Sequence, residues 1–131
     1  MMSKLPVDVV KGILYFMHEL GKSVFPANIP AIHEAFYKIS RDTKYEDLFS
    51  EFIFDEDFTY PYSGHVRSSL LALQSGGFLT CLNPELVKFQ ITNSFSDEDI
   101  KEFDDEDRAL LMEVAQKFYD EMECREVVSQ Y

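Results

Sequence analysis

The N-terminal part of the chain alternates apolar and polar positions with the period of an α-helix. Over residues 7–20 the apolar side chains fall three or four positions apart and Gly21 follows directly, which predicts one amphipathic helix. A second helix is predicted over residues 28–39, because Asn28 is a favourable N-cap residue. We expect the short apolar stretch Val24-Phe25 to be only a link between the two helices.

The next segment changes from helical spacing to an aromatic and acidic pattern. Thr43 and Glu46 have the spacing of a capping box, which predicts a short third helix with Leu48, Phe49 and Phe52 as its buried stripe and no defined end. Residues 52–62 then alternate aromatic with acidic side chains, and Pro61 interrupts the segment. This composition predicts an extended loop that is anchored by its rings.

A further helix and two strands are predicted in the middle of the chain. Ser63 begins the helix and Gly76-Gly77 end it, because glycine tolerates positive φ angles. Residues 78–82 and 86–92 are rich in β-forming side chains, and Asn83-Pro84-Glu85 joins them as a turn. These features predict a β-hairpin.

Acidic residues in the last third of the chain mark two helix starts. Ser96 and the acids after it predict a short helical turn, and Asp104 or Asp105 predicts the start of a long amphipathic helix. Acidic side chains are favoured there because they interact well with the positive end of the helix dipole. The expected fold class is therefore mainly α with a small antiparallel β-hairpin (α+β), in a single domain over residues 1–131.

The stretch from Tyr62 to Leu79 reads Tyr-Ser-Gly-His-Val-Arg-Ser-Ser-Leu-Leu-Ala-Leu-Gln-Ser-Gly-Gly-Phe-Leu. It resembles the third helix of winged helix-turn-helix domains, in which a Ser start, several Leu residues and a Gly stop lead into the wing. The resemblance implies a winged-helix-like core over about residues 5–95, followed by an acidic C-terminal helical extension over about residues 96–126.

Two shorter phrases are similar to the Panacea-type antitoxin domain. Tyr60-Pro61-Tyr62-Ser63 precedes a helix of the same pattern, and Leu14-Tyr15-Phe16 lies in an early helix. Proteins of that family neutralise toxins by protein contact. The resemblance therefore implies an antitoxin-like regulator that acts by binding another protein.

The formal net charge of −12 is concentrated near the C-terminus. Residues 1–95 contain 8 Lys and Arg against 11 Asp and Glu, a net charge of −3, whereas residues 96–131 contain 4 against 13, a net charge of −9. A negative surface repels phosphate and anionic lipid. We therefore expect the partner to be another protein with a basic surface, or a second copy of the chain in a homodimer.

Aromatic and acidic side chains are the candidates for protein contact. Tyr and Phe are favoured at the centres of interfaces, although anchoring of the loop to the core accounts for the same rings. The candidate residues are Phe58, Tyr60, Tyr62, Asp104, Asp105 and Glu106.

The alternative function is a dimeric transcriptional regulator that reads DNA with the 63–75 helix and the 78–92 hairpin. The residues that would face the duplex are His65, Arg67, Ser68, Ser69 and Lys88. Contacts from Lys and Arg to phosphate supply much of the affinity for DNA. Because this face offers few cations, DNA binding is possible but electrostatically disfavoured.

The motifs of several enzyme classes are incomplete. His18-Glu19 and His33-Glu34 each begin an HExxH motif, but Lys22 and Tyr37 stand where the second His is required. Residues 97–108 do not have the ligand spacing of a calcium-binding EF-hand loop. A Gly-rich phosphate loop and a GxSxG nucleophile motif are also absent from the sequence. We expect no catalytic site, no metal, no cofactor and no enzymatic activity.

Targeting and disulfide signals are likewise missing from the sequence. The N-terminus lacks the apolar region of a signal peptide, and every apolar run is far shorter than the roughly 20 residues of a membrane span. Cys81 and Cys124 have no CxxC spacing and are expected to be reduced thiols. These observations predict a cytoplasmic protein that does not associate with membranes.

Overall fold

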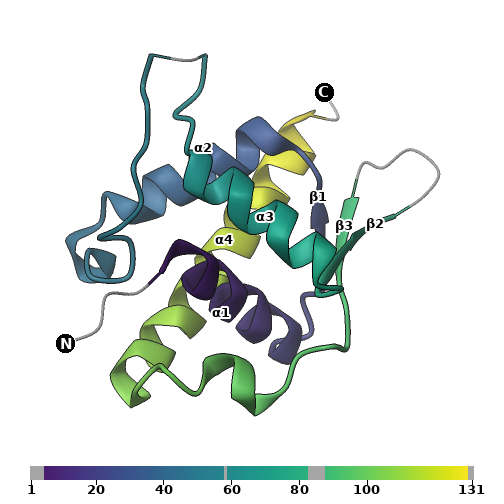
Figure 1. Ribbon diagram of the computed structural model, residues 1–131. Helices are drawn as coiled ribbons and strands as arrows, with labels where there is room; N and C mark the ends of the chain where they lie inside the picture. The colour runs from purple at the N-terminus through teal and green to yellow at the C-terminus, as the bar shows by residue number, and fades with distance from the viewer. Residues whose placement is uncertain (1–4, 58, 83–87, 130–131) are drawn as a thin grey trace.

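The computed structural model describes residues 5–57, 59–82 and 88–129 (Figure 1). In chain order the elements are α1 (Pro6–Glu19), β1 (Val24–Pro26), α2 (Ile29–Ser40), the 3-10 helix η1 (Thr43–Tyr45), α3 (Gly64–Ser75), β2 (Leu79–Cys81), β3 (Lys88–Ile91), the 3-10 helix η2 (Asp97–Ile100) and α4 (Asp105–Ser129). The expected class, mainly α with a small antiparallel β component, is confirmed.

The three strands form one antiparallel sheet in the order β1-β3-β2. The predicted hairpin is confirmed as β2 and β3, while its turn at residues 83–85 lies outside the described residues. The expectation that Val24-Phe25 is only a link is wrong, because both residues belong to β1 and pair with β3. Phe25 and Phe89 are register partners whose ring centroids lie 5.6 Å apart. This strand therefore depends on a partner that is far away in the sequence.

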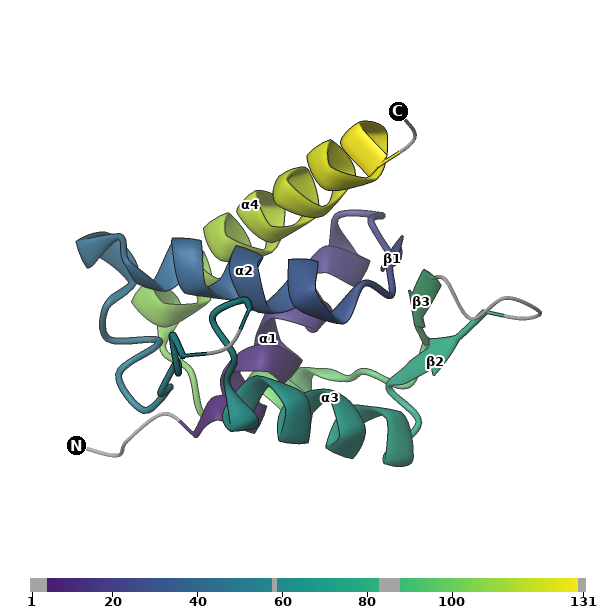
Figure 2. The ribbon, with the colours of Figure 1, turned by 90° about the horizontal axis from the view of Figure 1, so that it is seen from above.

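α1 is the central helix. It lies between α3 and α4 and contacts both, as Figure 2 shows from above. Every residue from Val9 to Met17 except Lys11 is buried. A Cβ atom at Gly12 would come within 2.9 Å of the Leu111 side chain, so glycine allows α4 to approach α1 closely. Gly21, with a φ angle of 78°, follows the end of the helix as predicted.

Local signals predicted the start of α2 and both ends of α3 correctly. The Asn28 side chain accepts a hydrogen bond from the backbone N–H of Ala31 at 3.1 Å, and Ser63 accepts one from Val66 at 3.3 Å. Gly77 follows α3 with a φ angle of 84°, a left-handed conformation that favours glycine. Each of these helix ends depends on residues a few positions away in the sequence.

The short third helix is not formed as predicted. Residues 43–45 form the single turn of η1, and turns continue as far as residue 51. Its N-cap is Asp42, whose side chain accepts a hydrogen bond from the backbone N–H of Lys44 at 3.0 Å. The predicted capping box of Thr43 and Glu46 is therefore wrong, because the preceding carboxylate binds the backbone of the first turn instead.

Both helix starts predicted in the acidic run are confirmed. At η2 the Asp99 side chain accepts a hydrogen bond from the backbone N–H of Ser96 at 2.7 Å. At the start of α4, the Asp104 side chain accepts a hydrogen bond from the backbone N–H of Asp107 at 2.8 Å. The acids in this segment therefore have a structural role as well as a charge.

Aromatic packing and one buried hydroxyl fix α4 to the rest of the protein. The Phe118 ring stacks on Phe36 with 4.6 Å between centroids and meets Phe25 edge-on at 5.4 Å. Tyr45 is buried, and its hydroxyl donates a hydrogen bond to Glu113 at 3.0 Å. Burial and this hydrogen bond raise the pKa of Tyr45 to about 12. α4 is therefore part of the same core as α1 and α2.

Candidate interaction surfaces

α3, the helix predicted to face DNA, exposes a different set of side chains from the one expected. Arg67 and Ser68 are exposed, and His65 is half-buried. The prediction that Ser69 lies on the exposed face is wrong, because this residue is 2% exposed and its hydroxyl donates a hydrogen bond to the carbonyl oxygen of His65 at 2.6 Å. Leu71, which the sequence reasoning did not single out, is 49% exposed.

The exposed face of α3 has little positive charge. Arg67 is the one cation of this helix, whose other exposed residues are Gly64, Ser68, Leu71, Ala72 and Ser75. Lys88 is half-buried at the start of β3, and residues 55–57 place exposed acids in the loop before the helix. Phosphate contacts depend on Lys and Arg, so this surface is a poor match for a DNA backbone.

The aromatic loop before α3 packs inward. Asp55 and Tyr62 exchange two backbone hydrogen bonds, of 2.6 and 3.0 Å, that close the loop. The Tyr62 ring stacks on His33 with 5.1 Å between centroids and an interplanar angle of 12°, and Tyr60 lies 5.4 Å from the same ring. Phe58 lies outside the described residues. This geometry favours anchoring of the loop as the role of Tyr60 and Tyr62.

His33 is fully buried between α2 and the start of α3. Its Nδ1 atom lies 2.9 Å from the carbonyl oxygen of Ile29, and its Nε2 atom lies 3.1 Å from that of Ser63. A carbonyl oxygen only accepts, so each contact is a hydrogen bond when the facing nitrogen carries a proton. His33 thus connects α2 to the N-cap residue of α3, a role that the incomplete HExxH motif did not indicate.

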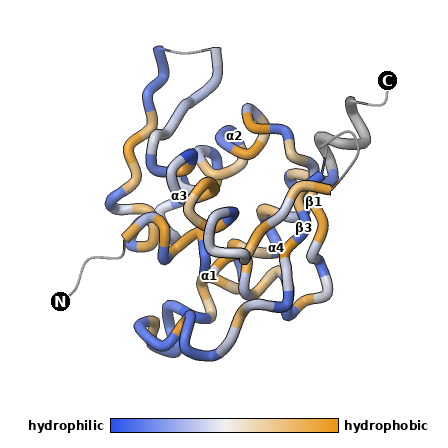
Figure 3. The backbone as a smooth tube through the Cα atoms, turned by 45° about the vertical axis from the view of Figure 1, so that its right-hand side comes forward, coloured by the Kyte–Doolittle hydropathy of each residue, from blue (hydrophilic) through white to orange (hydrophobic). Residues whose placement is uncertain are grey.

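Exposed acidic residues gather at η2 and the first turn of α4. The acidic face, as we name it, consists of the exposed residues Asp97, Glu98, Glu102, Asp104, Asp105 and Glu106. Figure 3 shows this segment as a hydrophilic stretch at the lower end of the molecule. The structure therefore brings the predicted acids of α4 together with those of η2.

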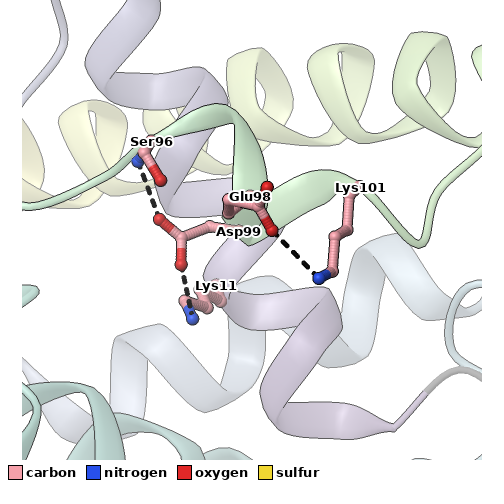
Figure 4. A network of polar contacts seen from close by, with 5 residues as sticks. All are labelled: Lys11, Ser96, Glu98, Asp99 and Lys101. Carbon is pink, nitrogen blue, oxygen red and sulfur yellow. Dashed lines mark hydrogen bonds and ion pairs between the residues drawn. The ribbon is translucent and has the colours of Figure 1, made fainter.

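Nearby cations neutralise only part of this charge (Figure 4). Lys11 pairs with Asp99 at 2.7 Å, and these side chains are only 24% and 13% exposed. Lys101 pairs with Glu98 at 2.9 Å, but these side chains are 64% and 76% exposed and water screens their attraction. Arg108 donates hydrogen bonds to two backbone carbonyl groups of the turn before α4, so its guanidinium is already engaged.

The crowding of acids extends to the start of α1. Burial, and then the nearby Glu102 carboxylate, raise the pKa of Asp8 above its ordinary value of 3.8, although Lys11 acts in the opposite direction. Ionised carboxylates near the acidic face therefore repel one another. A cation brought by a binding partner would reduce that repulsion.

The ion pair between Lys11 and Asp99 joins α1 to η2, and its contribution to stability can be tested. Burial alone would raise the pKa of Asp99, but the hydrogen bonds from Lys11 and the Ser96 backbone outweigh it and hold the pKa below 3.8. Such a carboxylate stabilises the folded protein when the pH is above the pKa that the group has in the unfolded chain. This stabilisation is lost as the pH falls through the lower pKa of the folded state. We expect Asp99→Asn to lower the free energy of unfolding by about 1 to 2 kcal/mol at neutral pH.

Urea denaturation at several pH values measures this effect. The difference between Asp99→Asn and the wild type should shrink as the pH falls below 3.8. The matched control is Glu98→Gln, which breaks the exposed pair with Lys101 and should change stability by less than about 0.5 kcal/mol. Equal effects of the two substitutions would contradict the difference in burial between the two pairs.

A groove of about 530 Å³ adjoins the acidic face. α1 contributes Tyr15, Phe16 and Glu19 to its walls, η2 contributes Asp97, and α4 contributes Ala109 and Met112. Sequence reasoning did not identify this groove, because its walls come from three segments that meet only in the folded chain.

The part of the chain that the structure describes contains neither a metal site nor a helix that could cross a membrane. Among the side chains of residues 5–57, 59–82 and 88–123, no three of His, Cys, Asp or Glu are arranged to hold a metal ion. In the same ranges, no helix combines the length and the apolar character that crossing a membrane requires. Comparisons of the chain with protein-family models, curated proteins and solved structures gave no match.

Proposed function

We propose that the chain is a non-enzymatic regulatory module that binds another protein through the acidic face. The observation that carries this proposal is the clustering of six exposed acids, from Asp97 to Glu106, beside cations that are few or already engaged. Complementary charge steers a partner to its site and selects it against wrong partners. The partner is a protein with a basic surface.

The scaffold in this proposal is winged-helix-like. The order helix, strand, helix, helix and hairpin supports it, together with the pairing of β1 onto the hairpin strand β3. The chain departs from helix-turn-helix proteins in the connection between α2 and α3, where residues 41–63 replace a turn of about 3 to 4 residues. This departure favours a role in protein contact over a role in reading DNA.

An antitoxin-like activity and a cytoplasmic location belong to the same proposal. An antitoxin that acts by contact needs a surface that is complementary to its target, and it needs no catalytic group. The acidic face supplies such a surface for a basic target.

Affinity capture from native lysate tests the proposal with two variants of equal charge. The test variant neutralises three acids of the acidic face: Asp104→Asn, Asp105→Asn and Glu106→Gln. The control variant neutralises three exposed acids elsewhere: Glu46→Gln, Asp47→Asn and Asp57→Asn. Asparagine at position 104 keeps an oxygen that can cap α4, so the helix start is preserved.

We expect the wild type and the control to retain a protein with a basic surface and the test variant to retain about 10-fold less. Added salt should release that protein, because screening weakens exposed charge pairs. Equal retention by both variants, or recovery of no basic partner by the wild type, would argue against the proposed function.

DNA binding is the second candidate, and the exposure of Arg67 and Ser68 on the helix before the hairpin is the observation in its favour. We expect a fluorescence polarisation titration with mixed-sequence duplex DNA at low salt to show no saturable binding up to about 10 µM protein. Saturable binding that weakens in Arg67→Ala would instead identify α3 as the DNA-binding helix.

A further inference from the structure

The groove beside the acidic face combines an apolar floor with an acidic rim. Phe16 and Ala109 contribute to it from α1 and α4, and Met112 is 44% exposed at its edge. Leu20, which is 38% exposed, is the C-cap residue of α1 and stands four positions after Phe16. Methionine is unbranched and polarisable, so it adapts to different apolar partners.

Two carboxylates line the groove together with these apolar side chains. Glu19 and Asp97 line the groove, and the Tyr15 hydroxyl donates a hydrogen bond to Asp97 at 3.0 Å that fixes the carboxylate in place. Asp105 lies on the same face of α4 as Ala109 and Met112, because their spacing is four and then three residues. Acidic side chains from α1 and η2 thus line the groove.

Arg108, the cation in the groove lining, does not cancel the negative charge of the carboxylates. Arg108 contributes to the lining, but its Nε atom donates to the carbonyl oxygen of Phe103 at 2.9 Å and its Nη2 atom donates to that of Ile100 at 3.1 Å. The guanidinium therefore holds the turn between η2 and α4. The groove lining contains two carboxylates, Glu19 and Asp97, against this one guanidinium, so its net charge is negative.

We infer that the groove binds an amphipathic, basic segment of a partner protein. A large apolar side chain of that segment packs over Met112, and its Lys or Arg side chains face Glu19 and Asp97. Segments of this kind bind grooves through a few apolar anchors at helical spacing. The inference rests on the proposed function, because the segment belongs to the same basic partner.

Charge complementarity selects this occupant over the alternatives. A second copy of the chain, with its net charge of −12, would bring acidic surfaces together at this groove. Anionic lipid and nucleic acid would meet the same repulsion from the carboxylates. The groove volume of about 530 Å³ gives anchoring side chains room to enter.

Selection of short random peptides displayed on phage tests the inference without a known partner. The full chain is the bait, and the best peptide is labelled and titrated by fluorescence polarisation against two variants. Met112→Lys changes the groove, and Leu71→Lys places the same new charge at a site of similar exposure on α3. Circular dichroism confirms that both variants remain folded.

We expect the selected peptides to combine one or two large apolar residues with several Lys or Arg, and to bind Met112→Lys about 10-fold more weakly than the wild type. Leu71→Lys should bind them within about 2-fold of the wild type. If basic peptides bind both variants equally, the groove is not their binding site, and the proposed function still stands. The inference would also be overturned if no basic amphipathic peptide were selected, or if the chain dimerised through this face. The capture experiment from lysate tests the proposed function separately.

Discussion

Replacement of His33 by alanine is expected to lower the free energy of unfolding by about 3 kcal/mol. The residue is fully buried, and both ring nitrogens face backbone carbonyl oxygens. The substitution leaves the Ser63 carbonyl without this partner and opens a cavity beneath the stacked Tyr62 ring. Urea denaturation followed by far-UV circular dichroism gives the midpoint and slope from which the change is calculated.

His65→Ala is the matched control for this prediction. His65 is half-buried, and its Nδ1 atom lies 3.3 Å from the backbone nitrogen of Ile53, so its loss should cost about 1 kcal/mol or less. His33→Phe keeps a ring against Tyr62 but removes both nitrogens, and it should recover part of the loss seen with alanine. Equal stability of His33→Ala and the wild type would mean that α2 and α3 are joined by other contacts.

The elements that sequence reasoning predicted correctly are those with local signals. The start of α2 follows from Asn28, the start of α3 from Ser63, and the end of α3 from its two glycines, each within a few residues of the helix it limits. The two helix starts in the acidic run follow from side chains that cap the adjacent backbone. Such signals do not depend on the rest of the chain.

The elements that sequence reasoning missed depend on distant residues. β1 contains only three residues, too few to show a periodic pattern, and it exists because Phe25 pairs with Phe89 in β3. The groove also depends on residues that are distant in the sequence, because the packing of α4 on α1 brings its walls together. Ser69 is different, since its spacing from Val66 and Leu73 already places it on the buried face of the helix.

The second large effect is expected from Phe118→Ala, which should lower the free energy of unfolding by about 4 kcal/mol. Phe118 is 1% exposed and packs against both Phe36 and Phe25, so alanine removes the ring contacts that join α4 to α2 and β1. Denaturation midpoints measure the loss. The control on the same helix is Met112→Ala, which removes a partly exposed side chain and should cost less than about 1 kcal/mol.

The Phe118 substitution also tests the acidic face, because α4 contains two of its residues, Asp105 and Glu106, and forms one wall of the groove. If the Phe118 contacts fix α4 against the core, Phe118→Ala should weaken binding of the selected peptides although residue 118 does not line the groove. The full effect on stability with unchanged peptide binding would show that the first turns of α4 are fixed independently, through Arg108 and the Asp104 cap. An unchanged stability would mean that the ring contacts of Phe118 do not hold α4 against the core, and that other contacts of the helix, such as Leu111 against Gly12, fix its position.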